Sequence, residues 1–229
     1  MRGIIGPNPS FRGDDGTPDP AVTETLRAFT AGEGSEQAAL TALAASRLLV
    51  PVVALPSAPA EKATEMALPT LIGLDGRSAI PAFTCLDSMR RWRPDARPVP
   101  AAARQVWQAA TADSCAVIID VAGPVPLAVE GARLAALARG EPAPPPFADS
   151  DVHEVVSDAL AGQLDVTAFE LRPGGAENDL VIALTLAADP AGRDVTELAG
   201  WVADSVLERL GGRLRRGIAI WLGRADAPA

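Results

Sequence analysis

The stretch MALPTLIGLDGRSAIPAFTCLDSMRRW, residues 66–92, carries the clearest structural signals in the chain. Two apolar runs, residues 66–74 and 78–84, lie on either side of an Asp75-Gly76 pair. An aspartate–glycine pair between apolar runs is the strongest short-range signal of a β-hairpin. Each run contains a proline, which favours sheet edges or strand starts because proline cannot donate to a strand ladder. The stretch therefore predicts two neighbouring antiparallel strands.

The second run leads into a predicted helix at residues 86–93, which ends before a proline. Thr84 stands three residues before Asp87, the spacing of a helix cap and an acidic residue in the first turn. We expect Thr84 to be the N-cap and Asp87 to pair with Arg91, four residues further along the helix. The sequence thus predicts an ordinary strand-to-helix corner.

The same corner has an enzymatic alternative. Five residues separate Cys85 from Arg91, which is the spacing of the phosphate-binding loop in cysteine-dependent phosphatases. Such a loop usually needs glycine, but residues 86–90 contain none, and Asp87 would repel a bound phosphate. The alternative is therefore a thiol-dependent enzyme, for sulfur or phosphoryl transfer, that uses Cys85 with Arg90 or Arg91.

Periodicity predicts the other elements of the first half. Helices are expected from Pro20 and after Ser35, followed by a buried strand at residues 48–55. After the corner we expect a helix at 100–112, an apolar strand at 115–121, and a last helix that stops at Gly140.

A proline-rich segment, GEPAPPPFADS at residues 140–150, separates the two halves. Four of its residues are prolines, which favour an extended linker. The second half predicts helices at 151–161 and 194–210 and strands at 164–171, 179–188 and 216–222. The glycine-rich RPGGAEN, residues 172–178, is expected to join two of these strands as a hairpin turn.

The predicted fold class is α+β, with two small domains, each a mixed sheet with helices packed mainly on one face. The expected organisation is a poorly ordered segment at 1–18, a first domain at 19–139, a linker at 140–150 and a smaller domain at 151–223.

Composition excludes several classes of function. The formal net charge of −9 argues against nucleic acid or an anionic membrane as the main partner. The chain lacks an apolar run long enough to span a bilayer, and glycine and proline interrupt the N-terminal residues where a signal peptide would need an apolar core. With two cysteines, the expected location is the cytoplasm. The single histidine, His153, and the spacing of the cysteines predict no metal site, and the sequence indicates no cofactor and no catalytic residue.

A binding surface is the favoured interpretation of the residues around the corner. Arginine and tryptophan are the side chains that most often anchor protein interfaces. The expected surface comprises Phe83, Arg90, Arg91, Trp92, Arg93 and Arg97. We expect a protein partner, and a small-metabolite pocket in the first domain is a further expectation.

Four longer stretches carry a family resemblance. They are SFRGDDGTPDP (10–20), RLLVPVVA (47–54), EMALPTLIGLDGRSAIPAFTCLDSMRRWRPDARPVP (65–100) and DVAGPVPLAVEGARLAALARGE (120–141). Together they resemble the SseB-like proteins (enhanced serine sensitivity) in the two-domain form of high-GC bacteria. The residues that match the family signature are Pro51, Pro69, Pro81, Phe83, Thr84, Leu86 and Trp92.

Residues 150–223 look similar to the C-terminal domain of that family, so the resemblance covers nearly the whole chain. It implies two α/β-type domains and a cytoplasmic location, and it implies no activity, cofactor or catalytic residue. The family pattern has a small residue, often serine, where this chain has Cys85, which weakens the enzymatic alternative.

Overall fold

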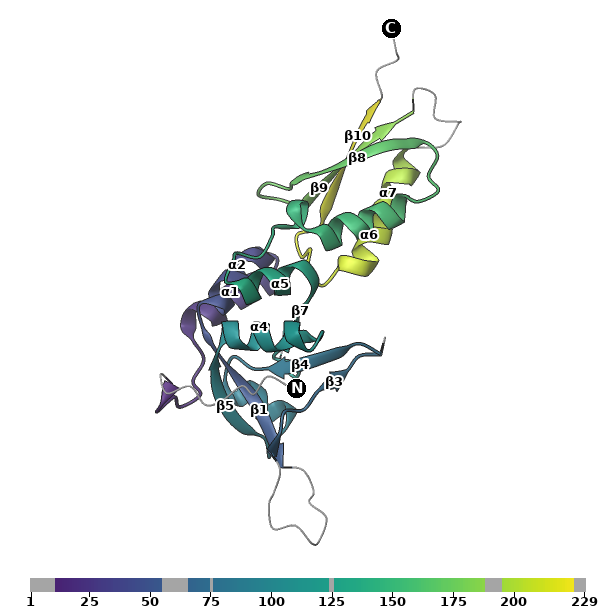
Figure 1. Cartoon of the computed structure of the whole chain (residues 1–229). Helices are drawn as coiled ribbons and strands as arrows, with labels where there is room; N and C mark the ends of the chain where they lie inside the picture. The colour runs from purple at the N-terminus through teal and green to yellow at the C-terminus, as the bar shows by residue number, and fades with distance from the viewer. Residues whose placement is uncertain (1–10, 55–65, 75, 124–125, 188–194, 225–229) are drawn as a thin grey trace. The chain divides into compact units, whose positions relative to one another are not determined.

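The computed structural model describes residues 11–54, 66–74, 76–123, 126–187 and 195–224 (Figure 1). These residues form seven α-helices and three small sheets, an α+β fold as the sequence predicts. None of the helices within the described ranges is long and apolar enough to cross a membrane.

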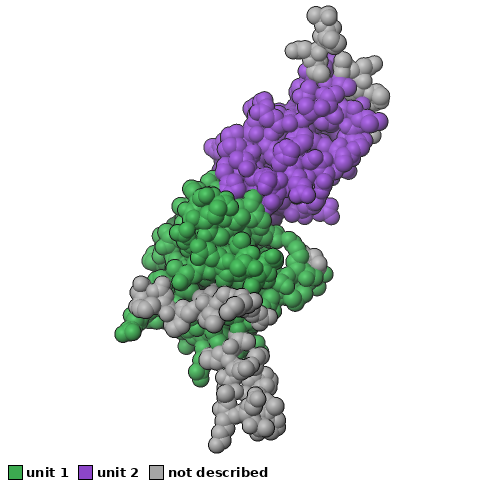
Figure 2. Space-filling view, viewed as in Figure 1, with its two compact units in different colours: residues 1–30, 37–143 green, residues 31–36, 144–229 purple. Residues whose placement is uncertain are grey.

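The chain divides into two compact units, coloured green and purple in Figure 2. Unit 1 comprises residues 1–30 and 37–143, and unit 2 comprises residues 31–36 and 144–229. The second unit therefore includes a short segment from the N-terminal part of the chain.

Unit 1 contains two sheets. The first is antiparallel with the order β2-β1-β5, formed by Met66–Ala67, Arg47–Ala54 and Arg97–Ala102. The second has the order β3-β4-β6-β7, formed by Leu71–Ile72, Ser78–Ala82, Ala116–Ile119 and Leu127–Val129. Only β4 and β6 run parallel in this sheet. Leu49 and Phe83 exchange two backbone hydrogen bonds, which join the two sheets.

The predicted hairpin is present, in a shorter form. β3 pairs with β4 through Leu71–Ala79 and Ile72–Ser78, while Asp75 itself lies outside the described residues. The run at 66–74 is not one strand, because β2 pairs with β1 and only β3 pairs with β4. Pro69 lies between the two pieces, so this run contributes to both sheets.

The expectation of a helix at 100–112 is wrong at its beginning. Helix α4 is Ala103–Ala112, and the six residues before it form β5 along the edge of the first sheet. Pro98 and Pro100 are two residues apart, so both of their nitrogens face the same side of this strand. On the outer side of an edge strand they remove donors without breaking a ladder hydrogen bond.

Five helices accompany the sheets of unit 1: α1 (Pro20–Thr30), α2 (Glu36–Ala44), α3 (Leu86–Trp92), α4 and α5 (Gly131–Arg139). α4 and α5 pack side by side (Figure 1). The main core lies between helices and sheets, with Phe29, Leu43, Leu48, Trp107 and Ile119 fully buried. A smaller cluster around Leu49, Phe83 and Met89 packs beneath α3.

Unit 2 is one mixed sheet with helices on one face (Figure 1). The sheet order is β10-β9-β8, in which β8 is antiparallel and β10 parallel to β9. The elements are η2 (Pro146–Ala148), α6 (Ser150–Leu160), β8 (Val166–Pro173), β9 (Leu180–Leu186), α7 (Val195–Leu210) and β10 (Ile218–Arg224). Alternate residues of β9, such as Ile182, are buried against Val156 of α6 and Val202 of α7.

The predicted turn between β8 and β9 requires glycine. A Cβ on Gly174 would lie 2.2 Å from the backbone oxygen of Asn178, and Gly175 has a φ of 74°. An ordinary side chain does not fit in the first position and is strained in the second.

Candidate functional site

The corner after β4 is capped by Cys85, one residue later than expected. Cys85 has extended backbone angles, and its Sγ accepts a hydrogen bond from the Ser88 amide at 3.5 Å. The expectation that Thr84 is the N-cap is therefore wrong. The Thr84 hydroxyl donates instead to Oδ2 of Asp120 at 2.6 Å, so it is not available to the helix.

Asp120 is the residue that organises this corner, and the sequence interpretation missed it. It follows β6 directly, as Phe83 and Thr84 follow β4, and the two strands are parallel neighbours. The carboxyl ends of parallel strands meet at one edge of a sheet, which is the signal that could have indicated Asp120. Its two oxygens accept from the Thr84 amide at 3.0 Å and from the Thr84 hydroxyl. Asp120 also has a φ of 48°, an uncommon conformation for a residue with a side chain.

Burial raises the pKa of Asp120 above the ordinary aspartate value. Hydrogen bonds from Thr84 and Ser88 and the positive charge of Arg91 act in the opposite direction without cancelling that effect. The corner thus contains an acid whose charged form is disfavoured by its surroundings.

Arg47 binds the N-terminal segment to the corner. Its guanidinium contacts Oδ2 of Asp14 at 2.6 Å and donates to the carbonyl oxygens of Thr17 and Thr84. The carbonyl oxygen of Gly16 accepts from the Leu86 amide at 2.8 Å, so this segment satisfies a donor in the first turn of α3. Residues 14–17 therefore lie against the corner, although the sequence predicts poor order up to residue 18.

Four exposed arginines surround Trp92 on and after α3; we call these five residues the arginine surface: Arg90, Arg91, Trp92, Arg93 and Arg97. Arg93 pairs with Asp95 at 3.3 Å. Within the described part of the chain the other three arginines form no ion pair, and the expected Asp87–Arg91 pair does not form. Arg90, Arg91 and Arg97 thus expose positive charge at one place in an acidic protein, and of the three Arg91 also acts electrostatically on the buried carboxyl of Asp120.

Phe83 is not part of this surface, which corrects the expectation. It is fully buried, in a cluster with Leu49 and Met89. Its ring lies 5.5 Å from the ring of the half-buried Trp92, at an angle of 33°. Phe83 therefore supports Trp92 from within the core and has no area to offer a partner.

Cys85 and the arginines do not form a phosphate-binding loop. Residues 86–92, which include Arg90 and Arg91, are helical, and the Met89 amide bonds to the Cys85 carbonyl within the helix ladder. The Cys85 thiol contacts the amide and hydroxyl of Ser88. Two first-turn amides of this helix are already used, because Leu86 donates to the Gly16 carbonyl and Ser88 donates to the Cys85 Sγ, so they are not available to an anion.

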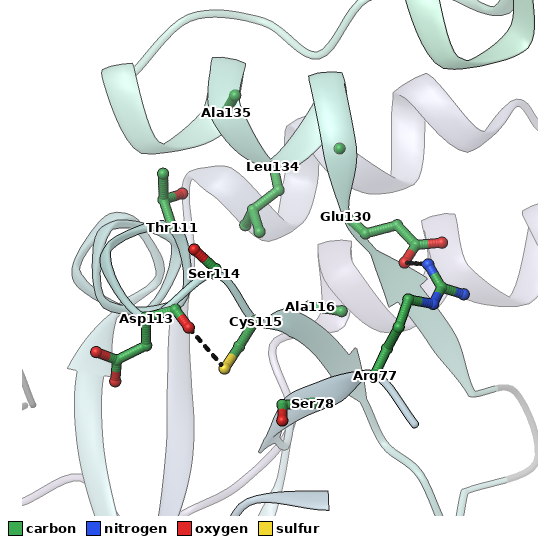
Figure 3. Close-up of a pocket in the computed structure, with 11 residues that line it drawn as sticks. Arg77, Ser78, Thr111, Asp113, Ser114, Cys115, Ala116, Glu130, Leu134 and Ala135 are labelled. Atoms are coloured by element: carbon green, nitrogen blue, oxygen red, sulfur yellow. Dashed lines mark hydrogen bonds and ion pairs between the residues drawn. The ribbon is translucent and has the colours of Figure 1, made fainter. Parts of the chain in front are cut away.

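A pocket of about 390 Å³ lies at the opposite end of the β4–β6 pair (Figure 3). Ser78 and Ala116, the first residues of the two strands, line it together with Cys115. Arg77 and Glu130 form an ion pair of 2.5 Å at one side, and Leu134 of α5 forms an apolar wall. The size and mixed polarity suit a small polar molecule.

Cys115 packs partly against the main core, and its thiol donates to the Asp113 carbonyl at 3.3 Å. The sequence interpretation of a small core residue accounts for that packing, but it did not find the pocket. The lining comes from separate segments of the chain, which no local pattern connects. Within the described ranges, no group of three or more histidine, cysteine or acidic side chains is placed to hold a metal ion.

Residues 22–136 match the family model described as the SseB protein N-terminal domain. This range includes the corner, the arginine surface and the pocket. No curated protein and no solved structure matches the chain.

Proposed function

Because the chain belongs to the SseB family, we propose that it is a non-enzymatic, cytoplasmic binding or regulatory protein that acts through protein contacts made by unit 1. The proposed contact is the arginine surface. A partner of complementary chemistry presents acidic side chains and an apolar group that packs on Trp92. The acidic net charge of the chain disfavours nucleic acid and anionic membranes as alternatives.

One observation carries this proposal: the positive charges are exposed, and Arg90, Arg91 and Arg97 lack ion pairs in the described structure. Trp92 lies among them with its ring supported by Phe83. Arginine and tryptophan held on a rigid element are the typical anchors of an interface, because little side-chain entropy is lost on binding.

The test is affinity capture of the full chain from lysate of its own cells, followed by mass spectrometry. We expect a reproducible partner that is lost from the Arg91→Glu/Arg97→Glu variant, which changes only exposed side chains. Arg27→Glu is the matched control, since Arg27 is exposed in unit 1 but lies on α1. A partner retained by both variants would contradict the proposed surface.

The enzymatic alternative uses Cys85 with Arg90 or Arg91, and the helical conformation of residues 86–92 weighs against it. A catalytic thiol reacts with iodoacetamide at about pH 6.5 far faster than a free thiol does. We expect slow alkylation of Cys85, measured in a Cys115→Ser background. Fast alkylation would favour the enzyme over the binding protein.

Binding of a small metabolite is a second candidate, and the pocket at Cys115 is the observation that favours it. Its volume is within the range of ligand sites, and it offers both hydroxyl groups and an ion pair. In a thermal-shift screen of small polar metabolites, a true ligand raises the Tm of the wild type. It leaves the Tm of Ala135→Trp unchanged, because Ala135 lines the pocket and tryptophan fills it.

A further inference from the structure

The edge strands of this protein differ in how well they resist pairing with another chain. A free edge presents unpaired backbone donors and acceptors, and proteins blunt it with short strands, prolines, bulges or charges. In the described structure of unit 1, the edges β2 and β3 have two residues, β7 has three, and β5 contains two prolines. In unit 2, β8 ends in Pro173 and has an irregular register between Val166 and Ala168.

β10 is neither short nor interrupted by a proline or a bulge. It pairs with β9 over its whole length, from Ile218–Leu180 to Arg224–Leu186, without a bulge, and β9 is its only neighbour in the described sheet. It contains no proline, and its only charged residue is the last one, Arg224. A seven-residue apolar edge of this kind is a template for a further strand.

Two large apolar side chains of β10 are also exposed. Trp221 is 55% exposed and Leu222 is 40% exposed. Strand alternation places Trp221 on the face of the sheet away from the helices, because Ile218 and Ile220 pack into the core. The Arg172 guanidinium lies 5.9 Å from the Trp221 ring on that open face. The edge therefore combines free backbone groups with apolar side chains on both sides.

We propose that β10 pairs with β10 of a second copy of this chain, antiparallel about a two-fold axis, with Trp221 opposite Trp221 of the second copy. A two-fold axis perpendicular to the sheet places the helices of both copies on the same face. The result is one continuous sheet of six strands with the order β8-β9-β10-β10-β9-β8. Such an interface is closed, so it produces dimers and not fibres.

The sequence of β10 is complementary to itself in this register. Ile220 lies opposite Leu222 of the second copy on the helix side, and Ala219 lies opposite Gly223 on the open face. Ile218 lies opposite Arg224, so no two like charges face each other in the ladder. Arg216, just before the strand, is already paired with Asp179 at 2.8 Å, so it adds little repulsion at the ends.

The proposed contact is small. Seven paired residues span about 23 Å, and with the flanking tryptophans the contact lies near the low end of specific interfaces, roughly 1,000 Å² in total. We therefore expect a reversible dimer whose population depends on concentration. The self-complementary register, in which no two like charges of β10 face each other, favours a second copy over a foreign strand.

Analytical ultracentrifugation of the full chain tests the proposal over roughly 1 to 200 μM, the range in which small interfaces dissociate. We expect a monomer–dimer equilibrium that Trp221→Lys shifts at least tenfold toward monomer. Mixing Trp221→Lys with Trp221→Glu should restore association, because position 221 faces itself and the mixed pair carries opposite charges. Trp201→Lys is the control, since Trp201 is also half-exposed but lies on α7.

Cysteine cross-linking tests the register in a Cys85→Ser/Cys115→Ser background. Directly opposite residues have Cα atoms about 5 Å apart, so Trp221→Cys should form a disulfide between copies within the dimer. Gly223→Cys is the control, because the two copies of position 223 would be about 13 Å apart. Gly223 also has room for a side chain.

Several outcomes would overturn the proposal. A monomer at every concentration excludes the dimer, and a dimer that Trp221→Lys leaves intact excludes this edge. Cross-linking of Gly223→Cys as fast as Trp221→Cys excludes the register. Association with a foreign protein that Trp221→Lys abolishes, while the purified chain stays monomeric, assigns β10 to another occupant.

Discussion

Asp120 shows how a single residue can link two strands and a helix. Its carboxylate accepts hydrogen bonds from the amide and from the hydroxyl of Thr84. Because the Thr84 hydroxyl is used in this way, Cys85 caps α3 instead. Burial removes this carboxyl from water, which disfavours its charged form and keeps its pKa above the ordinary value. The hydrogen bonds from Thr84 offset part of that cost. The corner therefore depends on the protonation of one buried acid.

The free energy of unfolding should depend on pH through Asp120. A raised native pKa means that this residue stabilises the fold fully below its ordinary value of 3.8, and that the contribution is lost as the pH rises through the native pKa. The asparagine of an Asp120→Asn variant cannot titrate, although its amide can donate to a rotated Thr84 hydroxyl. Relative to this variant, the wild type should therefore lose stability as the pH rises above about 4, in urea unfolding at a series of pH values.

Asp15→Asn is the control, because the contribution of Asp15 to the free energy of unfolding should change with pH in the opposite direction. Hydrogen bonds from Thr17 lower the pKa of Asp15, so its contribution appears as the pH rises and is lost as the pH falls. A difference between wild type and Asp120→Asn that stays constant with pH would contradict the role assigned to Asp120.

At the scale of elements, the prolines of an edge strand determine whether that strand can pair with a strand of another chain. Pro98 and Pro100 make β5 a poor template for a further strand, although its outer edge is open in the described sheet. β10 lacks such residues. The two edges give a matched comparison within one chain.

Replacing both prolines of β5 by alanine should create a second self-associating edge. The fold should persist, because the β1–β5 register already satisfies the inner side of the strand. In the Trp221→Lys background, Pro98→Ala/Pro100→Ala should increase static light scattering several-fold at about 100 μM, a concentration at which free edges associate. Unchanged scattering would show that β5 is protected by something other than its prolines.

The elements that the sequence predicts well have long, uniform patterns. The helices and strands of unit 2 and the strand β1 follow their expected ranges within a few residues, because apolar side chains repeat at a constant period. The sequence predicts no strand at β5, since its prolines and alanines fit neither period. The three-residue β7 is too short for any pattern, and the burial of Phe83 depends on a bridge to Leu49, which lies far earlier in the chain.

At the scale of the molecule, unit 2 contains a buried ionic cluster. Arg213 contacts Asp149 at 2.5 Å and Glu36 at 3.2 Å, and both carboxylates are almost inaccessible to solvent. Burial alone would lower the pKa of Arg213, but the two carboxylates outweigh it and raise the pKa. By comparison, Arg209 and Asp158 form a pair that is about half exposed.

Removing the cation from the buried cluster should cost much more than removing it from the exposed pair. Arg213→Met leaves two buried carboxylates without a positive partner, at a cost of about 3–5 kcal/mol in the free energy of unfolding. Arg209→Met should cost at most about 1 kcal/mol, because water screens that pair. Urea denaturation of unit 2 in the full chain measures both, and equal losses would contradict the difference in burial.

The inclusion of residues 31–36 in unit 2 has a consequence for the order in which the protein is made. Glu36 leaves the ribosome 177 residues before Arg213, its partner. At typical rates of translation, Arg213 is synthesised roughly ten to thirty seconds after Glu36. Unit 2 can therefore complete its folding only near the end of synthesis, because until then Glu36 lacks its contact with Arg213.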